Sequence, residues 1–174
     1  MRKKTWFWRV VVCLLILGIG AFSVLTLAGS RWSATRPQIN LVHIFEGEIN
    51  RRHKPTGFHA RPHGRDPHNA RVVKIMSPPN KAGVYTARVE IRDPKNGRWK
   101  KKFSSFFPDS MEKKEVIAAI LYAYRHRETG KGNPWRGPSG HGFPIQGYLS
   151  RRGGINTAFP IYIKGKNRKE RKGK

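Results

Sequence analysis

Cysteine is nearly absent from this chain of 174 residues, and its single copy, Cys13, lies in an apolar stretch near the N-terminus. The remainder therefore has no disulfide framework and no cysteine-based zinc site. Acidic residues are also scarce, since 10 Asp and Glu stand against 36 Lys and Arg and give a net charge of +26. Few carboxylates are left for paired-carboxylate catalysis. The charge predicts salt-dependent attraction to polyanions such as RNA, DNA or anionic lipid.

Long hydrophobic runs are missing except between Val10 and Ala28, where no charged residue occurs. This run approaches the roughly 20 residues that span a bilayer. Basic residues precede it, which favours an N-terminus in the cytoplasm and a body outside it. We expect residues 1–30 to be either a membrane anchor or a signal peptide cleaved near Ser30. The protein is then membrane-anchored facing the outside of the cytoplasm, or secreted.

The rest of the chain divides into three parts by composition. Residues 31–40 are predicted to be a linker. Residues 41–163 are predicted to form one folded domain, as the length of the chain suggests. Residues 164–174 are predicted to be a basic, disordered tail, because they carry almost no apolar side chains.

Alternating polarity and turn signals predict antiparallel strands. Residues 71–75 form one strand candidate, and residues 83–93 and 98–107 form two more. The Asn-Gly pair within residues 94–97 predicts a type I′ hairpin between the last two. The first of these two strands places four apolar side chains on one face: Tyr85, Ala87, Val89 and Ile91.

Three consecutive lysines in the strand candidate 98–107 are divided between its two faces. Alternation puts Lys100 and Lys102 on the face of Arg98. The other face carries Trp99, Lys101, Phe103 and Ser105. Lys101 is thus the one lysine of the three that lies between aromatic side chains, and we expect it to turn toward a cleft.

One helix is predicted within residues 108–130. Asp109 is the expected N-cap, Glu112 its partner in a capping box, and Gly130 the stop. The apolar stripe of this helix consists of Val116, Ile117, Ile120, Leu121 and Tyr124.

The C-terminal part of the domain is rich in glycine and proline. Residues 130–147 are expected to be a mobile loop, and residues 147–163 a second hairpin. One helix with several antiparallel strands predicts a small α+β domain.

Histidines are concentrated between His43 and His68, where five of the seven occur. A metal site is one explanation, but no pair has the H-E-x-x-H spacing, and proline and glycine interrupt the segment. The chain also lacks a G-x-S-x-G nucleophile elbow and a Walker-type phosphate loop. Histidine is therefore the abundant side chain that titrates near neutral pH.

A pair of histidines with a lysine is able to cleave RNA without a metal. A base removes the proton of the 2′-hydroxyl, an acid protonates the leaving 5′-oxygen, and a cation stabilises the charge on the phosphoryl oxygens. Several histidines and lysines of this chain are candidates for these roles.

Four motifs, in order, resemble the EndoU family of endoribonucleases, which includes animal uridylate-preferring endonucleases, the coronaviral uridylate-specific enzyme and bacterial toxin domains. "HIFEGEI" begins at His43, and "GFH" places His59 sixteen residues later. "KKFSS" offers Lys101 and Ser105 for the family's K-x-x-x-S pattern, and "NTAFP" stands where the family has T-x-Y-P. The resemblance covers about residues 41–162 and is strongest toward the bacterial branch.

The resemblance implies His43 and His59 as the acid and base, with their order open, and Lys101 as the electrostatic group. Arg61 or His63 is an alternative source of the positive charge. The implied activity is metal-independent cleavage of single-stranded RNA, preferably at uridines, giving a 2′,3′-cyclic phosphate. No cofactor is implied, and an immunity protein is a possible partner.

The resemblance also implies which residues bind the substrate. Thr157 and Phe159 contact the base or ribose, together with Ser105 and Arg61. Many relatives carry tyrosine where this chain has Phe159. Phenylalanine still stacks on a base, but it donates no hydrogen bond, so strict uridine selection does not follow from this residue.

Two other functions stay open from the residues alone. A noncatalytic, membrane-tethered RNA or polyanion binder needs only the basic tail, Trp135 and the cationic loop around it. A metal-dependent nuclease would use the histidine cluster instead.

Overall fold

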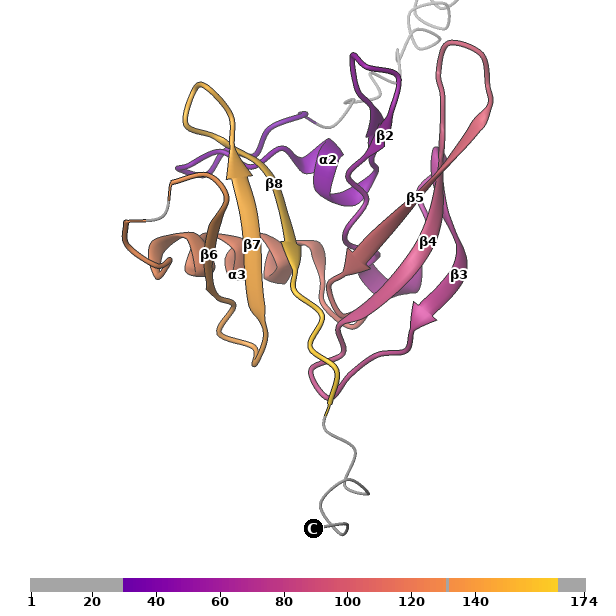
Figure 1. The fold of residues 1–174 in the computed structure, drawn as a ribbon. Coiled ribbons are helices and arrows are strands. Elements are labelled where there is room, and N and C mark those ends of the chain that lie inside the picture. The colour runs from indigo at the N-terminus through magenta and orange to yellow at the C-terminus, as the bar shows by residue number, and fades with distance from the viewer. Residues whose placement is uncertain (1–29, 131, 166–174) are drawn as a thin grey trace, which may run out of the picture.

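The computed structural model describes residues 30–130 and 132–165, which form two three-stranded antiparallel sheets with two α-helices (Figure 1). One sheet has the order β3-β4-β5 and the other the order β6-β7-β8. This confirms the predicted α+β class. The described ranges hold no helix long and apolar enough to cross a bilayer. The run from Val10 to Ala28, and residues 166–174 of the predicted tail, lie outside those ranges.

The first sheet consists of β3 (Ala70–Ser77), β4 (Tyr85–Arg92) and β5 (Trp99–Phe106). The predicted apolar face of β4 is buried and packs with Phe58 and Phe106. The hairpin between β4 and β5 is present, but its turn is not type I′, because among its residues only Gly97 has a positive φ, of 70°.

The predicted faces of β5 are reversed in the structure. Phe106 is fully buried and stacks on Tyr85 with ring centroids 5.0 Å apart, which fixes its side of the strand as the inner one. Alternation then turns Lys102 inward and Lys101 outward. Trp99 and Phe103 misled the prediction because they are aromatic yet exposed.

Helix α3 (Lys113–Arg125) is shorter than predicted. Its N-cap is Glu112, whose capping box is completed by Glu115. Asp109 was predicted as the N-cap, but its carboxylate instead accepts a hydrogen bond of 2.6 Å from the Tyr85 hydroxyl. The helix ends at Arg125, with His126 as its C-cap, rather than at Gly130. Its buried residues are Val116, Ala119, Ile120 and Ala123.

The second sheet consists of β6 (Trp135–Pro138), β7 (Pro144–Leu149) and β8 (Ile155–Pro160). The expected hairpin of β7 and β8 is confirmed, whereas the expected mobile loop contains β6. Trp135 is fully buried, so this side chain is not available to bind RNA. It lies over Gly147, where a Cβ would come within 2.2 Å of the indole, and this close packing explains why a Gly-rich segment is ordered.

The segment before residue 41, predicted as a linker, packs against the domain. Ile39 is fully buried and bridges to Ile155 of β8. It leads into α2 (Leu41–Phe45), which is followed by the small hairpin of β1 (Glu48–Ile49) and β2 (Pro55–Thr56) and by a 3-10 turn (Pro62–Gly64). The segments that carry the paired histidines are thereby held between the two sheets.

Candidate active site

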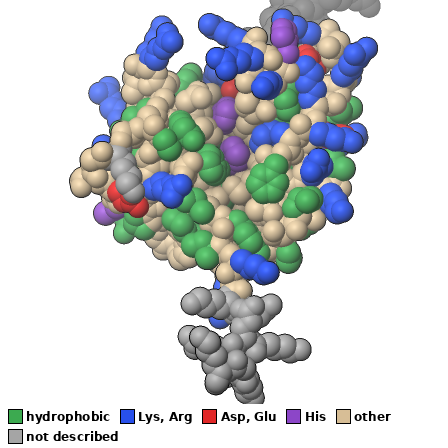
Figure 2. Space-filling view, viewed as in Figure 1, with side chains coloured by type: hydrophobic (Ala, Val, Ile, Leu, Met, Phe, Trp, Pro, Cys, Tyr) green, Lys and Arg blue, Asp and Glu red, His purple; other side chains and the backbone are tan. Residues whose placement is uncertain are grey.

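A cavity of about 420 Å³ lies where α2, the loop after β2, β5 and β8 meet. Figure 2 shows histidine side chains at the middle of this face, with hydrophobic side chains beside them. Six predicted or newly found site residues line the cavity: His43, His59, Lys102, Ser105, Thr157 and Phe159. The fold thus brings together side chains from both ends of the domain.

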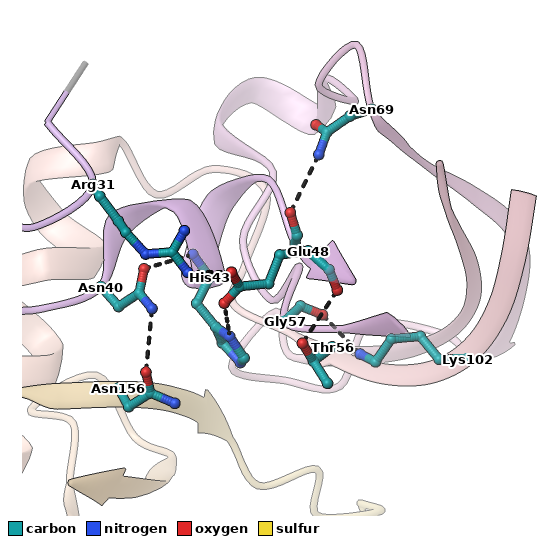
Figure 3. A network of polar contacts seen from close by, with 10 residues as sticks. Arg31, Asn40, His43, Glu48, Thr56, Gly57, Asn69, Lys102 and Asn156 are labelled. Carbon is teal, nitrogen blue, oxygen red and sulfur yellow. Dashed lines mark hydrogen bonds and ion pairs between the residues drawn. The ribbon is translucent and has the colours of Figure 1, made fainter. Parts of the chain in front are cut away.

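His43 is held in one orientation by its neighbours (Figure 3). Its backbone N–H donates to the side chain of Asn40, the N-cap of α2. Its ring Nδ1 lies 3.0 Å from Oε1 of Glu48, and Arg31 binds the other carboxylate oxygen. The hydrogen bond with His43 is the largest cause that lowers the pKa of Glu48. Because a carboxylate only accepts, Nδ1 donates and Nε2 is the nitrogen left for a ligand.

A left-handed turn at Gly57 and Phe58 places His59 beside His43. Their φ angles are 76° and 61°. A Cβ on Gly57 would come within 2.2 Å of the His43 carbonyl oxygen, so this position requires glycine. The N–H of Phe58 donates to that same oxygen at 2.8 Å, and the N–H of His59 donates to Ile44 at 2.7 Å. The two imidazole centroids are 6.1 Å apart as a result.

The ring of His59 is held by β5. Its Nδ1 lies 3.1 Å from the carbonyl oxygen of Ser105 and 3.0 Å from the hydroxyl of Ser104. Burial, reinforced by the nearby Lys102 and His43, holds the pKa of His59 well below its usual 6.5. His59 is therefore neutral at neutral pH. With Nδ1 donating to a carbonyl, its Nε2 carries the lone pair that accepts a proton.

Lys102 is the cation that the structure places in the cavity. Its Nζ donates to the carbonyl oxygen of Gly57 at 2.7 Å and to the Ser104 hydroxyl at 3.1 Å. That hydroxyl in turn donates to the carbonyl oxygen of Phe58 at 2.7 Å. Burial lowers the pKa of Lys102 to about 8. The same lysine therefore positions the His59 loop and brings positive charge to the site.

Lys101, predicted to face the cleft, does not line the cavity. Its side chain is 64% exposed, and its Nζ lies 4.0 Å from Glu90 on the outer face of the sheet. Lys102 was not identified from the sequence as the lysine that lines the cavity. The signal that finds it is Phe106, whose burial sets the inner face of β5.

Three residues predicted to bind the substrate line the cavity. Ser105 donates to the carbonyl oxygen of Pro160 at 2.7 Å and so joins β5 to β8. The Thr157 hydroxyl is buried and has no hydrogen-bond partner among the described residues. The ring of Phe159 lies 5.3 Å from that of His59, tilted by 31°. A second cavity of about 570 Å³ adjoins the first and shares Ser105 and Phe159 with it.

Arg61 and His63 do not line this cavity. The guanidinium of Arg61 binds Asp66 at 2.7 Å and Asp109 at 3.3 Å, and it donates to Tyr85. Through these contacts Arg61 holds its own loop against the sheet. His63 is exposed, as are His53 and His68. Within the described ranges, no three His, Cys, Asp or Glu side chains are grouped to hold a metal ion.

Known proteins are similar in sequence to the part of the chain that carries this cavity. The sequence model of the bacterial EndoU nuclease family matches residues 38–162. A protein of Bacillus cereus named "Toxin" is 36% identical over 125 residues, which are 69% of this chain and 22% of that protein. The chain thus spans about a fifth of the length of this relative. No solved structure matches. The chain belongs to the bacterial EndoU nuclease family.

Proposed function

We propose that this protein cleaves single-stranded RNA by metal-independent transesterification, with His59 as the general base and His43 as the general acid. The observation that carries the proposal is the paired orientation of the two rings. Each Nδ1 is engaged by an acceptor, Glu48 for His43 and the Ser105 carbonyl for His59. Both Nε2 atoms are then left for one substrate in a shared cavity.

The lowered pKa of His59 supports this assignment, because a base must start without its proton. Nε2 of His59 takes the proton of the 2′-hydroxyl as the 2′-oxygen attacks phosphorus. His43 gives a proton to the departing 5′-oxygen as the bond from phosphorus to that oxygen breaks. The products are a 2′,3′-cyclic phosphate and a free 5′-hydroxyl, and no electrons are exchanged.

Lys102 takes the electrostatic role that the K-x-x-x-S spacing assigned to Lys101. Two of its three N–H donors are used by Gly57 and Ser104, which leaves one for a phosphoryl oxygen. A buried ammonium stabilises developing negative charge more strongly than an exposed one, since water does not screen it.

Base selection is proposed for the wall formed by Ser105, Thr157 and Phe159. The Thr157 hydroxyl lacks a partner among the described residues and is suited to pair with the edge of a base. Phe159, next to the His59 ring, supplies a stacking surface. We propose a preference for uridine, and the missing tyrosine hydroxyl makes that preference weaker than in relatives that carry it.

The biological setting is proposed to be outside the cytoplasm. The basic residues before the apolar run favour export, either anchored in the membrane or secreted. The relative named "Toxin" supports a role in which the RNA of another cell is attacked, with an immunity protein as the partner that protects the producer.

The first prediction tests the chemistry itself. The full chain should cleave an oligoribonucleotide to products with 2′,3′-cyclic phosphate ends, and His43→Ala and His59→Ala should each lower the rate about 100- to 10,000-fold. An all-deoxy oligonucleotide should stay intact because it lacks the nucleophile, and a chelator should have no effect. Cleavage of the all-deoxy oligonucleotide contradicts the mechanism. So does a folded variant that carries both His43→Ala and His59→Ala and still cleaves RNA at the wild-type rate. His53→Ala is the matched control and should keep nearly full activity.

A comparison of adjacent lysines separates the two assignments. On a dinucleotide with a 5′ uridine, Lys102→Ala should lower kcat by about 100-fold or more, because the buried cation is lost. Lys101→Ala should leave that rate close to wild type. Lys102→Arg keeps the charge and serves as a partial rescue, and thermal melting of each variant identifies loss of folding. The reverse ranking in folded variants returns the role to Lys101.

The pH dependence follows from the two displaced pKa values. His59 acts as a base only while it is neutral. Because its pKa lies well below 6.5, it is still neutral at that pH, and the acid limb of kcat/KM should lie below 6.5. On the alkaline side the rate should fall no later than about pH 8, where Lys102 loses its proton. In the unfolded chain His59 takes up a proton near 6.5, so stability also declines below that pH. Melting temperatures at each pH separate unfolding from titration. An acid limb at or above pH 6.5 rejects His59 as the base.

Export is tested by a reporter fused after Lys174. A reporter that functions only outside the cytoplasm should be active, because the basic N-terminal cluster stays inside. Activity of a cytoplasm-only reporter in its place reverses the proposed orientation. Replacing the four basic residues before Val10 with neutral ones is the control and should weaken the orientation.

A further inference from the structure

The outer face of the β3-β4-β5 sheet carries exposed aromatic side chains among cations. Phe103 is 61% exposed and Trp99 is 37% exposed, although both are large apolar groups. Figure 2 shows Lys and Arg gathered on the right of the molecule, over this sheet, beside hydrophobic side chains. The cations exposed on this face are Arg71, Lys74, Arg88, Arg92 and Lys101.

The strand register interleaves the rings and the charges. Arg88 lies opposite Phe103, and Arg92 lies opposite Trp99. The guanidinium of Arg71 lies 4.3 Å from the centroid of the Trp99 ring. Cations and ring faces therefore alternate across the sheet.

The charge on this face is only partly neutralised inside the molecule. Glu90 is the carboxylate between the cations, and it binds Arg71 at 2.7 Å, with Lys101 at 4.0 Å. Arg88 has no ion pair within the described ranges. Repulsion between the remaining cations makes a polyanion the favoured ligand of this face. Exposed rings among such cations are the pattern by which sheets bind single-stranded nucleic acid.

The face is continuous with the catalytic cavity. Phe103 lines both the cavity of the two histidines and the adjoining cavity of about 570 Å³. Along β5 its neighbour Lys102 faces the chemistry, whereas Phe103 faces outward. Trp99 lies four residues away on the same face, roughly 13 Å along the strand. An RNA strand that leaves the cavity past Phe103 and follows β5 along this face therefore reaches Trp99.

We propose that this outer face binds the single-stranded segment of RNA next to the cleaved bond, with bases stacked on Phe103 and Trp99 and phosphates on Arg88 and Lys101. The inference rests on the proposed function, because it extends the same RNA beyond the catalytic cavity. It gives Lys101 a place in binding instead of in chemistry.

The test uses the full chain and three substrates, each with one cleavable uridine. The first is a dinucleotide, the second is a 12-mer with deoxynucleotide flanks, and the third is the same 12-mer with abasic flanks. Trp99→Ala should raise KM for the base-bearing 12-mer about fivefold or more, because stacking on one ring is lost. It should leave kcat for the base-bearing 12-mer unchanged, and it should leave both kcat and KM unchanged for the dinucleotide and the abasic 12-mer. Arg88→Ala should raise KM for both 12-mers and reduce the salt dependence of binding.

The control variants are Tyr122→Ala and Arg125→Ala, an exposed ring and an exposed cation on α3, which lies behind the β6-β7-β8 sheet in Figure 1. They should leave kcat and KM unchanged for all three substrates. Equal KM values of wild type and Trp99→Ala on the base-bearing 12-mer overturn the inference, even if every substrate is cleaved. Such a result leaves the face to a protein partner. Failure of the wild type on all three substrates instead rejects the proposed function.

Discussion

The active site depends on the left-handed turn at Gly57 and Phe58, which is held by hydrogen bonds from two elements. From α2, the carbonyl oxygen of His43 accepts the N–H of Phe58. From β5, Lys102 and Ser104 bind the carbonyl oxygens of Gly57 and Phe58. Because both sets of hydrogen bonds lie within two residues of His59, the distance between the two imidazoles is set by backbone hydrogen bonds as well as by side-chain packing. A positive φ at a phenylalanine costs energy, and the surrounding contacts offset it.

The burial of this turn also lowers two pKa values. Burial that shields the turn from water lowers the pKa of His59 and of Lys102. Both shifts oppose stability, since each group gives up solvation of its charged form. The same burial keeps His59 neutral and shields the charge of Lys102 from water. Burial of these two groups therefore costs folding stability, whereas the second sheet and its helix pack around an apolar core.

The sequence was sufficient for the fold class, for the hairpins β4–β5 and β7–β8, and for the pairing of His43 with His59, because alternation and motif order are local signals. It failed where a residue's neighbour is distant in the chain. Asp109 looked like an N-cap, but Tyr85 and Arg61 engage it. Residues 135–138 were predicted as loop, but they form a strand in which Trp135 packs on Gly147, a position without room for a Cβ. These contacts are tertiary, and no local pattern encodes them.

The two faces of β5 carry different lysines. Side chains alternate along a strand, so neighbouring residues serve opposite faces. Lys102 and Ser104 turn inward to the turn that carries His59, and Trp99, Lys101 and Phe103 turn outward. Slipping the register by one residue would exchange the two sets and turn Lys102 away from the site. Phe106 prevents this, because its ring is locked between Tyr85 and Phe58. One buried phenylalanine thus decides which lysine faces the cavity and which faces solvent.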